Sequence, residues 1–178
     1  MNKNLIYDKY LETTYGGTNR LTNDEYENAC EEYERLYGEL LFYKKNQKFL
    51  DIGCGTGHFL YFLMAKGYTN YFGIDISQSQ IKFYKKYIIP CCKTADAFEY
   101  LKNQKNTSSI ISSHDVIEHI SPKDVILFLE LIYSALRLEA ALLLKLPNMS
   151  NPFALNNRYR DFTHKCGFAE KVFIKFSI

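Results

Sequence analysis

Residues 48–63 read KFLDIGCGTGHFLYFL, in which a short apolar run, three closely spaced glycines and a second apolar run follow one another. The first run, residues 48–52, has the length and composition of a buried strand. The second run, residues 58–66, is apolar almost all round and stops at Gly67, as a packed helix does. Glycines between a strand and a helix let the backbone approach a ligand closely. The stretch therefore predicts a strand–turn–helix unit whose turn binds a cofactor.

The rest of the chain repeats this alternation of strand and helix patterns. We expect further strands at 71–75, 91–94, 109–113 and 140–146, and helices at 22–42, 77–87, 97–103 and 121–137. Alternating strands and helices form parallel βαβ units with right-handed crossovers. The predicted fold is therefore α/β, with a doubly wound, mainly parallel sheet.

No linker or repeat divides the chain, so we expect one domain over residues 1–178. Within it, residues 1–45 form an N-terminal arm and helix, residues 46–147 the cofactor-binding core, and residues 148–178 a segment on the substrate side. The five cysteines form no C-x-x-C pair, which argues for reduced thiols and against a zinc site built on them.

Charge and hydropathy limit the classes of partner. The formal net charge is only +2, so nucleic acid and anionic membranes are not expected partners, and a small-molecule substrate is. No apolar run reaches the roughly 18 residues of a membrane span, and the first residues lack the apolar core of a signal peptide. We therefore expect a cytoplasmic protein.

The glycine spacing separates two classes of cofactor. A dinucleotide-binding loop has the spacing G-x-G-x-x-G, which would require glycine at the position of His58. Here the glycines are Gly53, Gly55 and Gly57, and the acidic Asp51 before them is also foreign to the nicotinamide pattern. The loop resembles instead the first motif of the class I S-adenosylmethionine-dependent methyltransferases.

This resemblance continues in register down the chain, over roughly residues 48–168. It implies a Rossmann-like methyltransferase fold that binds S-adenosylmethionine. Asp51 would hold the methionine amino group, Asp75 the ribose hydroxyls and Asp96 the adenine amine. The cofactor-binding residues implied by the resemblance are Asp51, Gly53, Cys54, Gly55, Gly57, Asp75, Ile76, Asp96, Ala97 and Ser113. As alternatives, Asp75 and Asp96 could serve only to cap the helices that follow them.

A possible metal site follows the fourth predicted strand. Its residues have the spacing i, i+3 and i+4, which on a helix places three side chains on one face, and they are Asp115, Glu118 and His119. Two carboxylates and an imidazole suit Mg²⁺, Mn²⁺, Fe²⁺ or Zn²⁺, and His164 could supply a fourth ligand. In the alternative without a metal, His119 or His164 acts as the general base. A Glu-His pair at this place can also be merely structural.

The metal pattern resembles the ubiquinone-biosynthesis O-methyltransferases and the small-RNA 2′-O-methyltransferases. Residues 147–168 also resemble methyltransferases of bacterial surface-polysaccharide genes. Neither resemblance fixes the substrate, and we expect O-methylation of a small hydroxylated substrate, such as a sugar or its conjugate. An S-adenosylmethionine-binding domain without catalysis and, less favoured, an RNA 2′-O-methyltransferase are the alternatives. The usual Pro-Gly-Gly turn before the fifth strand is replaced by residues 138–141, Leu-Glu-Ala-Ala, far from the cofactor.

The chain ends one strand after the central five, so we expect it to lack the usual C-terminal hairpin. The fifth strand, residues 140–146, then becomes an apolar sheet edge that needs cover. We expect either the region after Pro147 to fold back over this edge, bringing His164 near Glu118, or a second copy to cover it in a homodimer.

Overall fold

The computed structural model describes residues 22–41, 45–87, 91–150, 161 and 163–169. Five parallel strands form one sheet in the order β3-β2-β1-β4-β5. They are β1 (Phe49–Ile52), β2 (Tyr71–Asp75), β3 (Cys92–Thr94), β4 (Ser108–His114) and β5 (Leu136–Lys145). The predicted doubly wound α/β fold is confirmed.

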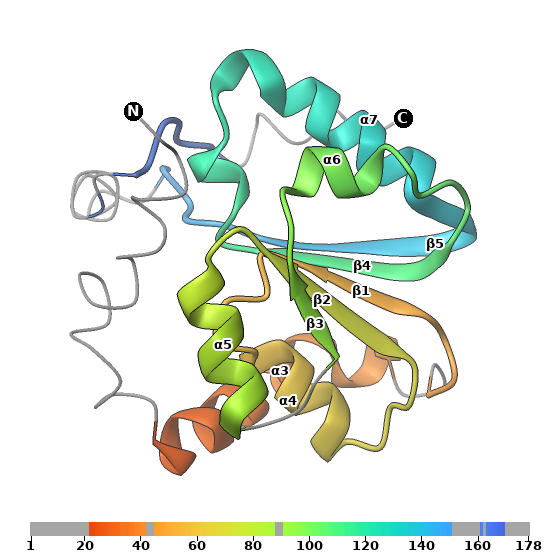
Figure 1. Cartoon of the computed structure of the whole chain (residues 1–178), viewed down its shortest axis with the longest axis vertical. Coiled ribbons are helices and arrows are strands. Elements are labelled where there is room, and N and C mark those ends of the chain that lie inside the picture. Colours follow the sequence, from red (N-terminus) through yellow and green to blue (C-terminus); the bar gives the residue numbers. More distant parts are fainter. Residues whose placement is uncertain (1–21, 42–44, 88–90, 151–160, 162, 170–178) are drawn as a thin grey trace.

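Helices cover both faces of this sheet (Figure 1). On one face lie α3 (Asn23–Leu41), α4 (His58–Ala65) and α5 (Gln78–Tyr87), and on the other lie α6 (Ala97–Leu101) and α7 (Val125–Ala135). Each face has its own apolar core. Phe49, Phe62 and Ile110 belong to the first core, and Leu50, Ile111 and Phe128 to the second. Neighbouring residues of β1 thus enter opposite cores, which explains why Phe49 and Leu50 are both apolar.

The helix expected over residues 121–137 is interrupted and ends early. Its start is a 3₁₀ turn, Pro122–Asp124, and Ser121 makes no side-chain capping bond there. Its end at Ala135 leaves Leu136 to pair with Ser108, so β5 begins four residues before the predicted strand. Glu139, in the replaced turn, has φ of +59°, a conformation that usually belongs to glycine.

β5 is an edge of the sheet that the described residues form. Beyond it, Asn148 and Phe168 form an isolated parallel bridge, and the Lys165 backbone N–H donates to the Glu118 carbonyl at 2.7 Å. Residues 163–169 therefore return to the segment after β4, as predicted for His164. Among the described helices, none is long and apolar enough to cross a membrane. The N-terminal arm, residues 1–21, lies outside the described residues.

Candidate active site

The glycine turn after β1 forms the floor of a pocket of about 300 Å³ at the carboxyl ends of the strands. The backbone N–H groups of Gly53 and Cys54 both donate to the Ile74 carbonyl, at 2.8 and 3.0 Å, which ties the turn to β2. Gly53 has φ of +73°, and a Cβ atom there would collide with Val116. Only glycine therefore fits this position without strain.

The Asp75 carboxylate links this turn to the next helix. Its Oδ2 accepts from the Gly55 backbone N–H at 2.8 Å, and its Oδ1 accepts from the Ser77 backbone N–H at 2.7 Å. The bond to the Ser77 backbone N–H, just before α5, agrees with the capping alternative. Asp75 also lines the pocket. Each carboxylate oxygen has a second lone pair, so Asp75 can still accept hydroxyl groups of a ligand.

Asp51 is the most deeply buried carboxyl in the pocket wall, with 2 % of its surface exposed. Its Oδ1 accepts from the Ser112 hydroxyl at 2.7 Å. Burial raises the pKa of Asp51 to about 7, and the nearby Asp75 adds to the rise. A carboxyl in this condition gains strongly from a cationic partner, because pairing restores its charged form.

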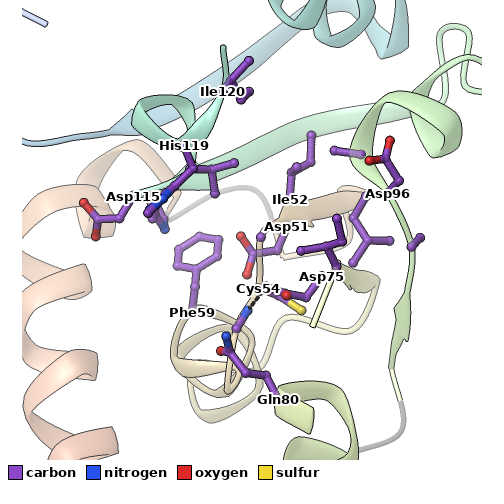
Figure 2. Close-up of a pocket in the computed structure, with 18 of the residues that line it drawn as sticks. Asp51, Ile52, Cys54, Phe59, Asp75, Gln80, Asp96, Asp115, His119 and Ile120 are labelled. Carbon is purple, nitrogen blue, oxygen red and sulfur yellow. Dashed lines mark hydrogen bonds between the residues drawn. The ribbon is translucent and has the colours of Figure 1, made fainter. Parts of the chain in front are cut away.

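The third acid of the cofactor motifs, Asp96, caps α6 by accepting from the Glu99 backbone N–H at 3.1 Å. It also lines the pocket, so its capping role and a ligand role are compatible. Of the ten residues proposed from the resemblance, Gly57 and Ser113 do not line the pocket, and the other eight do. Figure 2 shows Asp75 and Asp96 toward one end of the pocket, and Asp115 and His119 toward the other.

The expected helix carrying Asp115, Glu118 and His119 is not formed. β4 continues to His114, Asp115 takes φ of +53°, and only a three-residue 3₁₀ turn, Ile117–His119, follows. Asp115 therefore does not share a helical face with the other two. It lines the pocket and lies outside the group of candidate metal ligands.

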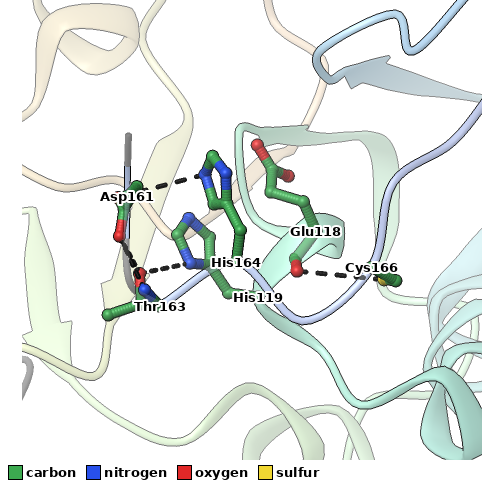
Figure 3. Close-up of polar contacts among 6 residues, drawn as sticks. All are labelled: Glu118, His119, Asp161, Thr163, His164 and Cys166. Carbon is green, nitrogen blue, oxygen red and sulfur yellow. Dashed lines mark hydrogen bonds and ion pairs between the residues drawn. The ribbon is translucent and has the colours of Figure 1, made fainter. Parts of the chain in front are cut away.

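Glu118, His119 and His164 do come together, with one candidate ligand atom of each within 4.8 Å of the others (Figure 3). Glu118 is 2 % exposed, and its two carboxylate oxygens have no hydrogen-bond partner among the described residues. Burial raises the pKa of Glu118 to about 7. Burying a carboxylate without hydrogen-bond partners costs free energy, and a bound cation at this place would reduce that cost.

A hydrogen-bond chain orients the His119 ring. The Thr163 hydroxyl donates to Asp161 Oδ1 at 2.6 Å and lies 2.8 Å from His119 Nδ1 (Figure 3). Since its single proton goes to Asp161, Thr163 accepts from His119 Nδ1–H, which leaves the lone pair on Nε2. Burial lowers the pKa of His119 to about 4, so the ring is neutral at pH 7.

The aromatic side of the pocket was not predicted from the sequence. Tyr33, Phe59 and His114 line it, and Tyr26 braces the glycine turn by donating from its hydroxyl to the Thr56 carbonyl at 2.8 Å. The tyrosines recur at roughly helical spacing along α3, a signal that indicates a packed face but not what it packs against.

Comparisons with known proteins place this arrangement in a family. A family model described as a methyltransferase domain matches residues 22–172. A crystal structure of an S-adenosylmethionine-dependent methyltransferase from Archaeoglobus fulgidus has a TM-score of 0.74 at 25 % identity, covering 98 % of this chain and 72 % of that one. A putative methyltransferase from Bacillus halodurans shares the fold, with a TM-score of 0.65 at 18 % identity over 79 % of this chain and 64 % of that one.

Among characterised proteins, phosphoethanolamine N-methyltransferase 3 of Arabidopsis thaliana is 30 % identical over 51 % of this chain. The chain spans only 23 % of that enzyme's length. The matched family model covers most of the chain, and the fold and glycine turn agree with it. The chain therefore belongs to the class I S-adenosylmethionine-dependent methyltransferase family. The pocket fits the family's cofactor, since a buried carboxyl, an acceptor for hydroxyls and a glycine turn line it together.

Proposed function

We propose that the chain transfers a methyl group from S-adenosylmethionine to a hydroxyl of a small acceptor, such as a sugar or its conjugate. The cofactor supplies an activated methyl on its sulfonium, and the protein aligns the acceptor with it. Asp51 would pair with the methionine amino group, and Asp75 and Asp96 would bind the nucleoside. The observation that supports a hydroxyl acceptor is His119, whose Nε2 lone pair is oriented by Thr163 in the pocket wall.

His119 would accept the proton that the hydroxyl loses as the methyl group arrives. Transfer of labelled methyl from S-adenosylmethionine to a panel of sugars, catechols and primary amines tests this proposal. The amine arm is included because the plant relative is named for N-methylation. We expect His119→Ala to lower kcat by about 100-fold or more and to leave cofactor affinity unchanged. Thr163→Val, which removes the orienting hydroxyl at nearly constant shape, should have a kcat between those of His119→Ala and the wild type.

Cofactor binding without transfer to any acceptor would instead support the alternative, a binding domain without catalysis. Transfer to amines alone, insensitive to His119→Ala, would overturn the assignment of a hydroxyl acceptor. The two outcomes differ in whether product forms at all.

A second candidate, metal-assisted transfer, is favoured by the low pKa of His119, which makes the ring a weak base on its own. Glu118, His119 and His164 would hold the metal. A divalent ion there would lower the pKa of the acceptor hydroxyl. The unpartnered oxygens of Glu118 support the site, and the neutral His119 ring is the form that ligates metals.

Calorimetric titration with Mn²⁺ or Zn²⁺ tests this second candidate without relying on turnover. We expect saturable binding that Glu118→Gln abolishes and Asp115→Asn, a matched loss of a neighbouring carboxylate, retains. Chelator should then abolish methyl transfer while leaving cofactor affinity nearly unchanged. Full turnover in excess chelator, or equal loss of metal binding in both variants, would contradict the three-ligand site.

A further inference from the structure

His114 is a pocket residue to which neither the cofactor nor the proposed proton transfer gives a role. It ends β4 and lines the same pocket as Asp51 and His119. Its neighbour Tyr33 also lines the pocket. The ring therefore lines the pocket while it packs against Phe59 of the apolar core.

Three aromatic rings fix the orientation of the His114 imidazole. Tyr33 and Tyr37, one turn apart on α3, stack on it with ring centroids 5.4 and 5.6 Å away. Phe59 of α4 meets it edge-to-face at 4.9 Å, with the ring planes at 85°. A side chain held from two helices in this way is preorganised, which lowers the entropy lost when it binds a ligand.

The two nitrogens of this ring are in different situations. Nε2 lies 3.1 Å from the Tyr37 hydroxyl, within hydrogen-bond distance. Nδ1 has no hydrogen-bond partner among the described residues. Burial lowers the pKa of His114 to about 4, assisted by Lys145, and burial raises the pKa of Tyr37. Both groups therefore stay neutral at pH 7, and a phenol that donates to Nε2 places the ring proton on Nδ1.

We propose that His114 is a substrate-binding residue whose Nδ1–H donates to an oxygen of the acceptor, with Tyr37 as the positioning residue that sets this tautomer. The inference rests on the proposed function and refines its substrate class to a hydroxylated ring. Tyr33 and Phe59, which also line the pocket, offer apolar ring surface beside the donor. A neutral imidazole donates one hydrogen bond without attracting an anion, which matches an uncharged hydroxyl or ring oxygen.

Nuclear magnetic resonance of the full chain with ¹⁵N-labelled histidine tests the proposal, since the chain has only four histidines. The probes are catechol and methyl α-D-glucoside, which share a hydroxylated ring but differ in aromaticity, each added with saturating S-adenosylhomocysteine. We expect His114 to carry its proton on Nδ1, and one probe to shift its ring signals. Tyr37→Phe should convert His114 to a mixture of tautomers, whereas Tyr61→Phe, which removes a phenol outside the pocket, should not.

In turnover assays with the responding probe, His114→Phe should raise KM about 3- to 10-fold with little change in kcat, the loss of one neutral hydrogen bond. A His114 signal that responds to neither probe, or a proton on Nε2 that Tyr37→Phe leaves in place, would overturn the proposal. A His114 response without methyl transfer would instead count against the proposed function and leave the binding role standing.

Discussion

The Asp51 carboxyl is the residue whose chemistry the pocket most clearly alters. Its pKa is raised by burial to about 7, against about 3.9 for an exposed aspartate. Between these values the folded protein holds a proton that the unfolded chain releases. The carboxyl therefore lowers the stability of the cofactor-free fold progressively as the pH rises from about 4 to about 7, and the full cost persists above pH 7.

We accordingly expect Asp51→Asn to stabilise the cofactor-free protein at pH 8 by on the order of 2–4 kcal/mol, and to have little effect near pH 4. The Ser112 hydroxyl keeps an acceptor in this variant, since the amide oxygen can replace Oδ1. Urea unfolding at both pH values measures the difference. Asp24→Asn, on the exposed first turn of α3, controls for the loss of one negative charge. A change in stability of the same size at both pH values would contradict the raised pKa.

The same variant should bind S-adenosylmethionine more weakly, because the methionine ammonium would lose its charged partner. In the wild type, affinity should rise between pH 6 and pH 8, since Asp51 must ionise to form this pair. Isothermal titration calorimetry between pH 6 and pH 8 measures this affinity. A flat pH profile, or full affinity in Asp51→Asn, would remove Asp51 from the cofactor site.

Most of the residues proposed for cofactor binding line the pocket, and the sequence could indicate them because they lie in a contiguous turn or at strand ends in register. His114 could not, since its partners Tyr33 and Tyr37 lie on a helix roughly 80 positions earlier and nothing local marks the contact. Asp115 was assigned to the metal group on the assumption of a helix, and its positive φ separates it from Glu118.

At the scale of elements, the glycine turn joins β1 to α4 through conformations that side chains rarely adopt. Gly53 and Gly67 both have positive φ, at +73° and +76°, but only Gly53 has an atom in the way of a Cβ. Substituting alanine at Gly67 therefore measures the cost of backbone strain alone, and substituting it at Gly53 measures strain together with steric overlap.

We expect Gly67→Ala to lose about 1 kcal/mol of unfolding free energy, the cost of the left-handed conformation. Gly53→Ala should lose about 3 kcal/mol or more, because collision with Val116 adds to the same strain. Adding Val116→Ala should recover part of the difference. Equal losses for the two single variants, measured by urea unfolding, would show that Val116 moves aside freely.

The boundary between α7 and β5 could not be predicted from the local sequence pattern. Leu136 and Arg137 are good helix formers, and the prediction extended the helix over them. In the structure Leu136 pairs with Ser108 and the helix ends at Ala135. Pairing with a strand distant in the sequence outweighs local propensity there, so the position of the boundary is set by tertiary structure.

At the scale of the whole molecule, β5 is one of the two strands, with β3, whose outer edge the described residues leave without a neighbouring strand. Apolar strand edges of this kind are normally covered. We therefore expect the outward-facing amides of residues 140–146 to exchange slowly with deuterium, whether a later segment or a second copy covers them. Light scattering then distinguishes the two, since only the second gives a dimer. Fast exchange along this strand in a monomer would contradict both.

The order of the elements, the two-faced core and the position of the pocket all followed from alternating sequence patterns. Parallel strands have their carboxyl ends at one edge, so the motif residues that follow them converge there. The return of residues 163–169 to Glu118 was expected for His164, because the region after Pro147 was predicted to fold back over the edge of the fifth strand. Its anchoring bonds, such as the one from Lys165 to the Glu118 carbonyl, were not visible in the sequence.

The most direct test of the account is calorimetric titration of the chain with S-adenosylmethionine, S-adenosylhomocysteine and NAD. Both sulfur-containing ligands should bind at one site, and NAD should not. Asp75→Asn should weaken that binding by about 10- to 100-fold, because the ribose hydroxyls lose a charged acceptor. Tight binding of NAD, with no binding of S-adenosylmethionine or S-adenosylhomocysteine, would contradict the assignment of S-adenosylmethionine as the cofactor.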